Sequence, residues 1–202
     1  DLTPSLAWRR DFDAGHALRV DARVWTWRYA FNRATLGFDG ADALNAYETG
    51  QGETLAYGGE ATVDYDHALS EAWNLKLTAL QRLTFDDGED LFEDFDAVGV
   101  FGGAVALVES ESEGETVLRA EARRSAGQDS AWVYSAEGAY NFLEGDLDLF
   151  EDTGAGLVEI VLPVSDTRVE EHRVDLAARR IWAPAPDWSL EGGLTVEFSR
   201  IA

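Results

Sequence analysis

The chain has 202 residues, and its 16 Lys and Arg against 39 Asp and Glu give a formal net charge of −23. This charge argues against nucleic-acid binding, because a phosphate backbone is held by clustered basic side chains. There is no Cys, so disulfides, thiolate metal sites and a cysteine nucleophile are excluded. Hydrophobic residues make up 46% of the sequence, which is too much for a disordered acidic tail.

A membrane-spanning helix is also excluded. The longest stretch without charge runs from Ala97 to Val108, whereas a helix needs about 20 apolar residues to cross a bilayer. A closed barrel of strands is another way to cross, so a membrane location stays open. The chain starts at Asp1 and has no Met, so we expect a processed product or a fragment.

Alternation of apolar and polar residues with a period of two recurs along the chain, and this pattern is typical of half-buried strands. It is clearest from Leu55 to Tyr65 and from Trp188 onward. In chain order the pattern predicts eight strands, at Leu6–Phe12, Leu18–Val24, Leu55–Tyr65, Trp73–Ala79, Thr116–Ala122, Trp132–Phe142, Val174–Trp182 and Trp188–Arg200.

The connections between these strands alternate in length. We expect short turns near Asp13–His16, His67–Ala72, Ser125–Ser130 and Ala183–Asp187. We expect long polar loops at Asn32–Glu53, Asp86–Val108 and Leu143–Asp166. The sequence therefore predicts an all-β, antiparallel up-and-down meander of about eight strands. Residues 1–202 would form one unit of four successive hairpins, with every short turn at the same end.

The hairpin registers can be predicted by placing opposite charges across from each other, which stabilises a strand pair by about 0.2–1 kcal/mol. The facing pairs that this predicts are Arg9 with Asp21, Asp64 with Lys76, Arg119 with Glu137, Arg173 with Glu197, and Arg179 with Glu191.

The same alternation fits two kinds of barrel in which the apolar face points in opposite directions. A soluble, lipocalin-like barrel places its apolar face inside, whereas a membrane barrel places it against lipid and keeps its charges in a wet lumen. The asymmetry of the connections favours the membrane barrel. So does the mixture of Gly59, Gly138 and Gly192 into the apolar face, because a core needs close packing and lipid conforms to any surface.

Four tryptophans at the short-turn ends of their strands predict an aromatic girdle at a membrane interface, although each alone could be a core aromatic. They are Trp73, Trp132, Trp182 and Trp188. Alternation also puts Arg10, Arg124 and Arg180 on the apolar face. An Arg at the bilayer midplane costs about 2–4 kcal/mol. All three lie within a few residues of a short turn, where snorkelling lowers this cost.

The second strand breaks its own pattern. Leu18 to Val24 puts apolar residues on one face, and Trp25, Trp27, Tyr29 and Phe31 then fall on the other. We favour a β-bulge near Val24–Trp25, which would return these aromatics to the outer face and take Arg28 off it. The alternative is an aromatic ligand platform inside the lumen.

Two acidic stretches raise the possibility of calcium binding. They comprise Asp86, Asp87, Glu89, Asp90, Glu93, Asp94 and Asp96, and then Glu144, Asp146, Asp148, Glu151 and Asp152. Neither has the spacing of a calcium loop, so solvated loops are the favoured interpretation.

The sequence predicts no enzyme. His16 and His67 fall in short turns on different hairpins, far along the chain from His172, and no nucleophile is placed near His172. We expect no catalytic residue, no metal and no cofactor.

Several segments are similar to the barrel of outer-membrane TonB-dependent receptors. They are Leu75–Arg82 (LKLTALQR), Glu113–Arg119 (EGETVLR), Ser135–Phe150 (SAEGAYNFLEGDLDLF), Leu157–Arg173 (LVEIVLPVSDTRVEEHR) and Trp188–Ala202 (WSLEGGLTVEFSRIA). The resemblance implies a piece of a barrel of about 22 strands, closed by a separate plug domain. It implies the outer membrane of a Gram-negative cell, contact with its lipid, and uptake of siderophores, cobalamin or other scarce nutrients.

The resemblance gives this chain no plug and no TonB-contacting segment, so TonB would be reached only through a segment outside it. No ligand-binding residue can be assigned from the resemblance. A short first strand and a long last strand favour a truncated piece of a larger barrel. A small complete outer-membrane barrel and a soluble ligand-binding barrel remain as alternatives.

Overall fold

The computed structural model describes residues 2–12, 15–127, 129–185 and 187–202, and these residues form strands and turns without a helix. The strands are β1 (Ser5–Phe12), β2 (His16–Phe38), β3 (Leu44–Ala68), β4 (Trp73–Asp96), β5 (Phe101–Ser125), β6 (Ser130–Asp152), β7 (Val158–Ile160), β8 (Asp166–Ala185) and β9 (Trp188–Ile201). Within these ranges there is no helix long and apolar enough to cross a membrane.

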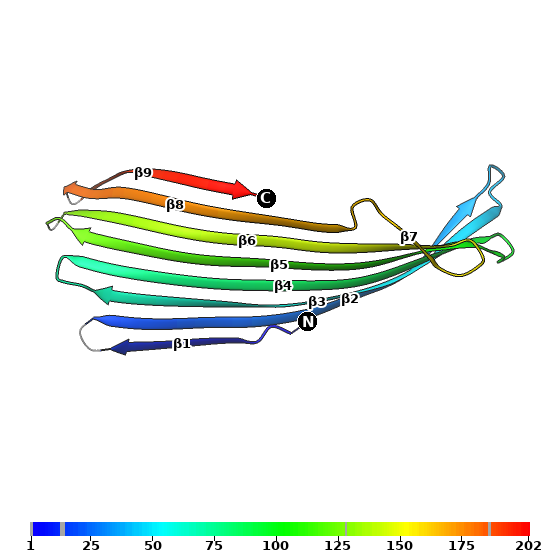
Figure 1. Cartoon of the computed structure of the whole chain (residues 1–202), viewed down its shortest axis with the longest axis horizontal. Coiled ribbons are helices and arrows are strands. Elements are labelled where there is room, and N and C mark those ends of the chain that lie inside the picture. Colours follow the sequence, from blue (N-terminus) through cyan, green and yellow to red (C-terminus); the bar gives the residue numbers. More distant parts are fainter. Residues whose placement is uncertain (1, 13–14, 128, 186) are drawn as a thin grey trace.

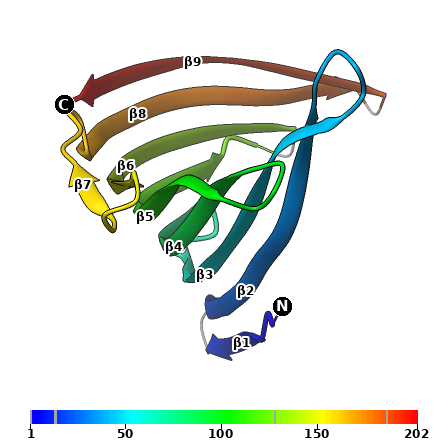
Figure 2. The ribbon, with the colours of Figure 1, turned by 90° about the vertical axis from the view of Figure 1, so that its right-hand side faces the viewer.

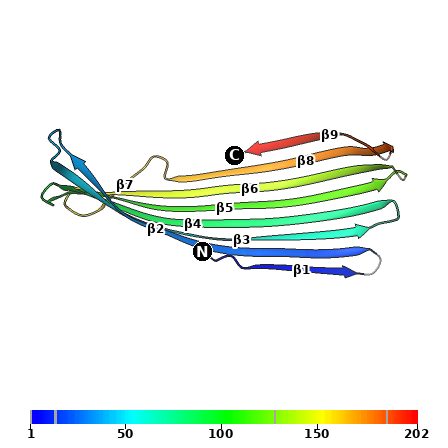
Figure 3. The same ribbon diagram turned by 180° about the vertical axis from the view of Figure 1, so that it is seen from behind.

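The strands form one antiparallel sheet in the order β1-β2-β3-β4-β5-β6-β8-β9, and β7 pairs with residues 149–151, close to the C-terminal end of β6. Figures 1 and 3 show this order from the two sides. The predicted all-β meander is therefore confirmed, with the short β7 as a ninth strand. The sheet is curved, and its edge strands β1 and β9 lie far apart without pairing, so it is open (Figure 2).

Short turns join the two strands of each predicted hairpin at one end of the sheet (Figure 1). The pairs are β1 with β2, β3 with β4, β5 with β6, and β8 with β9. Four residues of the predicted short turns, Asp13, Ala14, Gln128 and Pro186, lie outside the described residues. We call this end of the sheet the short-turn end, and the opposite end the outer end.

The three predicted long loops are wrong, because the strands continue through most of those residues. The connections are only Asp39–Ala43, Ala97–Val100, and the two segments Thr153–Leu157 and Val161–Ser165 on either side of β7. Each of the six strands β2 to β6 and β8 has 20 residues or more. The error has a physical cause. Toward the outer end the alternation fades while backbone pairing goes on: Asp86–Asp96 is largely polar on both faces, and Phe101–Val108 is uncharged on both.

The register is as predicted in one hairpin and shifted by two residues in the other three. Arg119 lies opposite Glu137, as expected. Arg9 instead faces Arg19, Asp64 faces Thr78, Arg173 faces Ser199, and Arg179 faces Gly193. Opposite charges also attract diagonally across a strand pair, so the charge pattern could not fix the register. An even shift leaves every side chain on its predicted face.

The predicted bulge near Val24–Trp25 is wrong. From His16 opposite His67 to Gly37 opposite Ala46, β2 pairs with β3 without a shift. The aromatics from Trp25 to Phe31 therefore stay on the face opposite Val24. Arg28 stays on the same face as Val24, where its guanidinium forms an ion pair with Glu53.

Candidate functional site

The sheet has two chemically distinct faces, and single cross-strand rows display them. One row crosses all eight strands other than β7 through Trp8, Val20, Val63, Ala79, Leu118, Gly138, Val174 and Phe198. The neighbouring row on the other side comprises Arg9, Arg19, Asp64, Thr78, Arg119, Glu137, Asp175 and Glu197. We call these the apolar face and the charged face.

The apolar face is exposed. Leu118 retains 63% of its accessible surface and Leu194 retains 71%, and Val63, Leu77 and Leu176 are exposed as well. A lipid-facing surface should be exposed in the isolated chain, and Val63, Leu77, Leu176 and Leu194 meet this expectation. Soluble proteins rarely leave so continuous an apolar surface uncovered.

Burial concentrates on the opposite face. Ala56 is 0% exposed and Val133 is 4% exposed, and Thr84, Ala131 and Ala139 are also buried. By register all five share the charged face; Ala104 is the one buried residue with a side chain on the apolar face among the described residues. The charged face is therefore the more enclosed side of the curved sheet.

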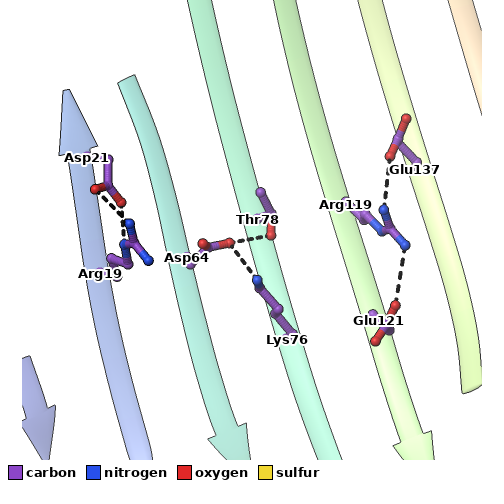
Figure 4. Close-up of polar contacts among 8 residues, drawn as sticks. All are labelled: Arg19, Asp21, Asp64, Lys76, Thr78, Arg119, Glu121 and Glu137. Atoms are coloured by element: carbon purple, nitrogen blue, oxygen red, sulfur yellow. Dashed lines mark hydrogen bonds and ion pairs between the residues drawn. The ribbon is translucent and has the colours of Figure 1, made fainter. Parts of the chain in front are cut away.

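Ion pairs and hydrogen bonds connect the strands across the charged face (Figure 4). The Asp64 carboxylate accepts a hydrogen bond from Thr78 Oγ1 at 2.6 Å and lies 3.2 Å from Lys76 Nζ. Arg119 lies 3.3 Å from Glu121 on its own strand and 4.0 Å from Glu137 across the pair. Farther along, Arg173 Nη2 lies 3.3 Å from Glu137 and Arg179 lies 3.1 Å from Glu191.

At the short-turn end, a row of alternating tryptophans and arginines borders the apolar face. Trp73 faces Arg124, Arg124 faces Trp132, and Trp132 faces Arg180. Each guanidinium carbon lies 5.6 Å from an indole centroid, Arg124 over Trp73 and Arg180 over Trp132. Tyr134 stacks against both indoles, at 6.4 and 6.1 Å between centroids. We call these four row members the Trp–Arg row.

The other two predicted girdle residues lie at the same end of the sheet. Trp182 is opposite Leu190, and Trp188 is opposite Ala185 beyond a shift in register. Both are exposed. All four tryptophans thus lie where the girdle prediction needs them, and their contact with a membrane interface remains a prediction.

A second aromatic group borders the apolar face toward the outer end. Tyr57 stacks on Phe85 at 5.2 Å, and Tyr140 lies 4.9 Å from the His172 ring. Beyond these residues charges enter the same face between apolar residues, among them Asp87, Glu89 and Glu144. Between Trp73 and Phe85, β4 rises about 40 Å along its length, or about 30 Å if tilted by 40°. This height is close to the apolar band of a membrane barrel, about 25 Å.

Aromatic side chains also gather on the outer half of the charged face. Arg23 and Arg82 place their guanidinium carbons 5.6 and 5.7 Å from the Trp25 ring. Trp27 and Tyr29, farther along β2, are exposed. This placement agrees with the ligand-platform alternative for these aromatics, and not with a return to the outer face.

The acidic stretches are mostly strand residues that project from both faces, not solvated loops. Among the described residues no group of three or more His, Asp or Glu could hold a metal ion. Asp39 and Asp152 cap the connections: each accepts two backbone N–H bonds, and these bonds lower the pKa of both carboxyls. When protonated, the Asp146 carboxyl donates a hydrogen bond to Asp166, directly opposite it, and this bond raises the pKa of Asp146.

The histidines are arranged differently from the prediction. His16 and His67 are strand residues that face each other across β2 and β3, with ring centroids 3.9 Å apart. Tyr65 Oη lies 2.8 Å from His16 Nδ1. The sequence could not show this pair, because the β2–β3 register is set by a long hairpin. His172 lies on β8, beside Tyr140.

No protein-family model and no curated protein matches the chain. Its class is therefore defined by its own geometry: an open antiparallel meander with an exposed apolar face and an ion-paired, more enclosed charged face.

Proposed function

We propose that this sheet is part of the wall of a β-barrel that spans the outer membrane of a Gram-negative cell. Its apolar face would contact lipid and its charged face would line a wet lumen. One observation carries the proposal: an apolar row crosses the whole sheet with its large side chains mostly exposed, while charged residues fill nearly all of the adjacent row. Lipid stabilises such a surface, whereas water does not.

The properties of the charged face favour a hydrated lumen on the side of the sheet opposite the apolar face. The carboxylates and guanidinium groups of the charged face are paired but not sealed off, since Arg119 and Arg179 both keep nearly half of their side-chain surface exposed. Ion pairs in a packed, dry core would carry a large desolvation cost. A hydrated lumen avoids that cost and leaves the pairs to orient neighbouring strands.

The free edges favour a larger barrel over this sheet alone. In hydrocarbon every backbone N–H and C=O needs a partner, so β1 and β9 would have to pair with further strands or with each other. β1 and β9 lie far apart in the curved sheet and do not pair with each other (Figure 2). This geometry fits further strands between them.

We further propose that the barrel is that of a TonB-dependent receptor for a siderophore- or cobalamin-type nutrient. The sequence resemblance supports this class, and so do strands that extend well past the apolar band at the outer end. Such extensions would form a wall above the membrane. Trp27 and Tyr29 on that wall offer exposed aromatic surface to a ligand.

The test uses the intact protein in membranes. We expect it to fractionate with the outer membrane, to need detergent for extraction, and to bind one of a panel of ferric siderophores and cobalamins with quenching of tryptophan fluorescence. Outer-membrane location without binding to any member of the panel would contradict the receptor and leave the barrel. A protein that stays monomeric in buffer without detergent would contradict both and favour the soluble barrel.

A further inference from the structure

The Trp–Arg row combines unpaired positive charge with an apolar surface. Arg124 and Arg180 are exposed on the apolar face. Among the described residues, neither guanidinium lies within ion-pair distance of a carboxylate, although ten other arginines do. Arg10, Arg123 and Arg200 also have no carboxylate within that distance among the described residues, so what distinguishes Arg124 and Arg180 is that each stacks on an indole at the border of the apolar face.

The surroundings of these arginines position them without neutralising them. Each guanidinium lies over an indole, and Tyr134 stacks against both indoles. Stacking on an aromatic ring restrains the planar guanidinium and leaves its N–H groups available. Since β5 and β8 are separated only by β6, the two arginines stand about 10 Å apart.

The occupant must satisfy those N–H groups at the boundary between apolar surface and water. From this arrangement we infer that the Trp–Arg row binds the phosphate groups of anionic phospholipids, one at each arginine. A guanidinium matches the oxygens of a phosphate in charge and in geometry. The indoles meet the glycerol and upper acyl region, where tryptophan is favoured. The inference depends on the proposed membrane location and deepens it by naming the lipid chemistry.

Neighbouring residues provide a matched control. Arg123 precedes Arg124 on β5, and Arg179 precedes Arg180 on β8, so both project from the charged face at the same height. The double variant Arg124→Gln/Arg180→Gln removes two charges from the apolar face. Arg123→Gln/Arg179→Gln removes two charges from the same strands on the opposite face.

The experiment measures binding of phosphatidylglycerol to the intact protein in dodecyl maltoside micelles. Brominated phosphatidylglycerol quenches tryptophan fluorescence on contact, and brominated phosphatidylcholine is the zwitterionic comparison. We expect the wild type to prefer phosphatidylglycerol, Arg124→Gln/Arg180→Gln to lose tenfold or more of that affinity, and Arg123→Gln/Arg179→Gln to change it less than twofold. Millimolar inorganic phosphate should not compete, because the apolar part of the site recognises a lipid.

Each other result overturns the inference. Equal affinity for the two lipids, an unchanged preference in Arg124→Gln/Arg180→Gln, or an equal loss in the control variant would show that the row does not bind phosphate. Competition by inorganic phosphate would mean that the row binds a free anion and not a lipid.

Circular dichroism verifies the fold of each variant. If the double variant misfolds, the single variants Arg124→Gln and Arg180→Gln are measured in its place. If brominated lipids of both kinds fail to quench, the membrane location itself is wrong; quenching without preference leaves that location intact.

Discussion

The ring of Trp25 covers Gly58, the residue directly opposite it across the β2–β3 pair. A Cβ at Gly58 would lie 2.5 Å from Cζ2 of Trp25 and 2.6 Å from the carbonyl oxygen of Leu83. An aromatic ring that packs over a glycine of the neighbouring strand is a recognised way to stabilise a curved sheet. This contact explains why a large aromatic is accommodated on the crowded charged face.

Replacing Gly58 with alanine should destabilise the sheet by about 1–3 kcal/mol, the usual cost of overpacking. The backbone oxygen of Leu83 cannot move away as a flexible side chain could. Gly138 on the apolar face is the matched control, because a Cβ added there would meet no heavy atom within 4 Å. Gly138→Ala should change the free energy of unfolding by less than about 0.5 kcal/mol. Urea unfolding of the intact protein in detergent measures both, and equal effects would contradict this account.

The contacts of Asp64 predict a second difference. Asp64→Ala removes the hydrogen bond from Thr78 and the ion pair with Lys76, and should cost about 1–2 kcal/mol. Asp66 lies on the same strand and face. Among the described residues its side chain forms no ion pair and no hydrogen bond. Asp66→Ala makes the same change in charge and should cost less than about 0.5 kcal/mol. Urea midpoints that fall equally for both variants would mean that the contacts of Asp64 contribute nothing.

The facing pair Asp146 and Asp166 predicts a pH dependence at the outer end. The hydrogen bond that protonated Asp146 donates to Asp166 raises the pKa of Asp146, as do partial desolvation and the nearby charge of Asp148. A raised carboxyl pKa in the folded state stabilises the protonated form, so the contribution is present in acid and is lost as the pH rises through that pKa. Hydrogen exchange, corrected for intrinsic rates, should show β6 and β8 opening more readily at pH 7 than at pH 4 around these residues.

Asp146→Asn should remove most of this pH dependence and slow exchange at pH 7, since the amide cannot repel Asp166. Asp148→Asn is the comparison, because Asp148 lies on the same strand but does not face Asp166. Protection from hydrogen exchange that is independent of pH in the wild type would contradict the hydrogen bond between Asp146 and Asp166. An identical response in the two variants would contradict it as well.

Except in β2 beyond Val24, the sequence was sufficient for the strand faces and for the order of the hairpins. Leu118 and Arg119 fall on opposite faces because alternation has a period of two, and registers that were wrong by two residues left these faces unchanged. The apolar face of Arg124 and Arg180 followed from the same rule. Their stacking on Trp73 and Trp132 did not, because it depends on pairing between hairpins as well as within them.

Other features were hidden for separate physical reasons. The stretch from Asp86 to Asp96 resembled a loop because its residues are polar on both faces, yet its backbone pairs with β3 and β5 throughout. Trp25 was assigned to the outer face through a bulge near Val24–Trp25, because bulges are common in barrel strands. Gly58 supplies the space that makes the other face possible.

The most direct test of the central claim compares two adjacent residues on β5. Because this sequence has no Cys, a spin label can be attached singly at Leu118→Cys or at Arg119→Cys in the intact protein, reconstituted in phospholipid vesicles. Oxygen concentrates in lipid, and a nickel chelate stays in water. The account predicts high collision with oxygen and low collision with the chelate at position 118, and the reverse at position 119. Chelate access at 118 with oxygen access at 119, or equal access at both, would contradict a lipid-facing apolar surface.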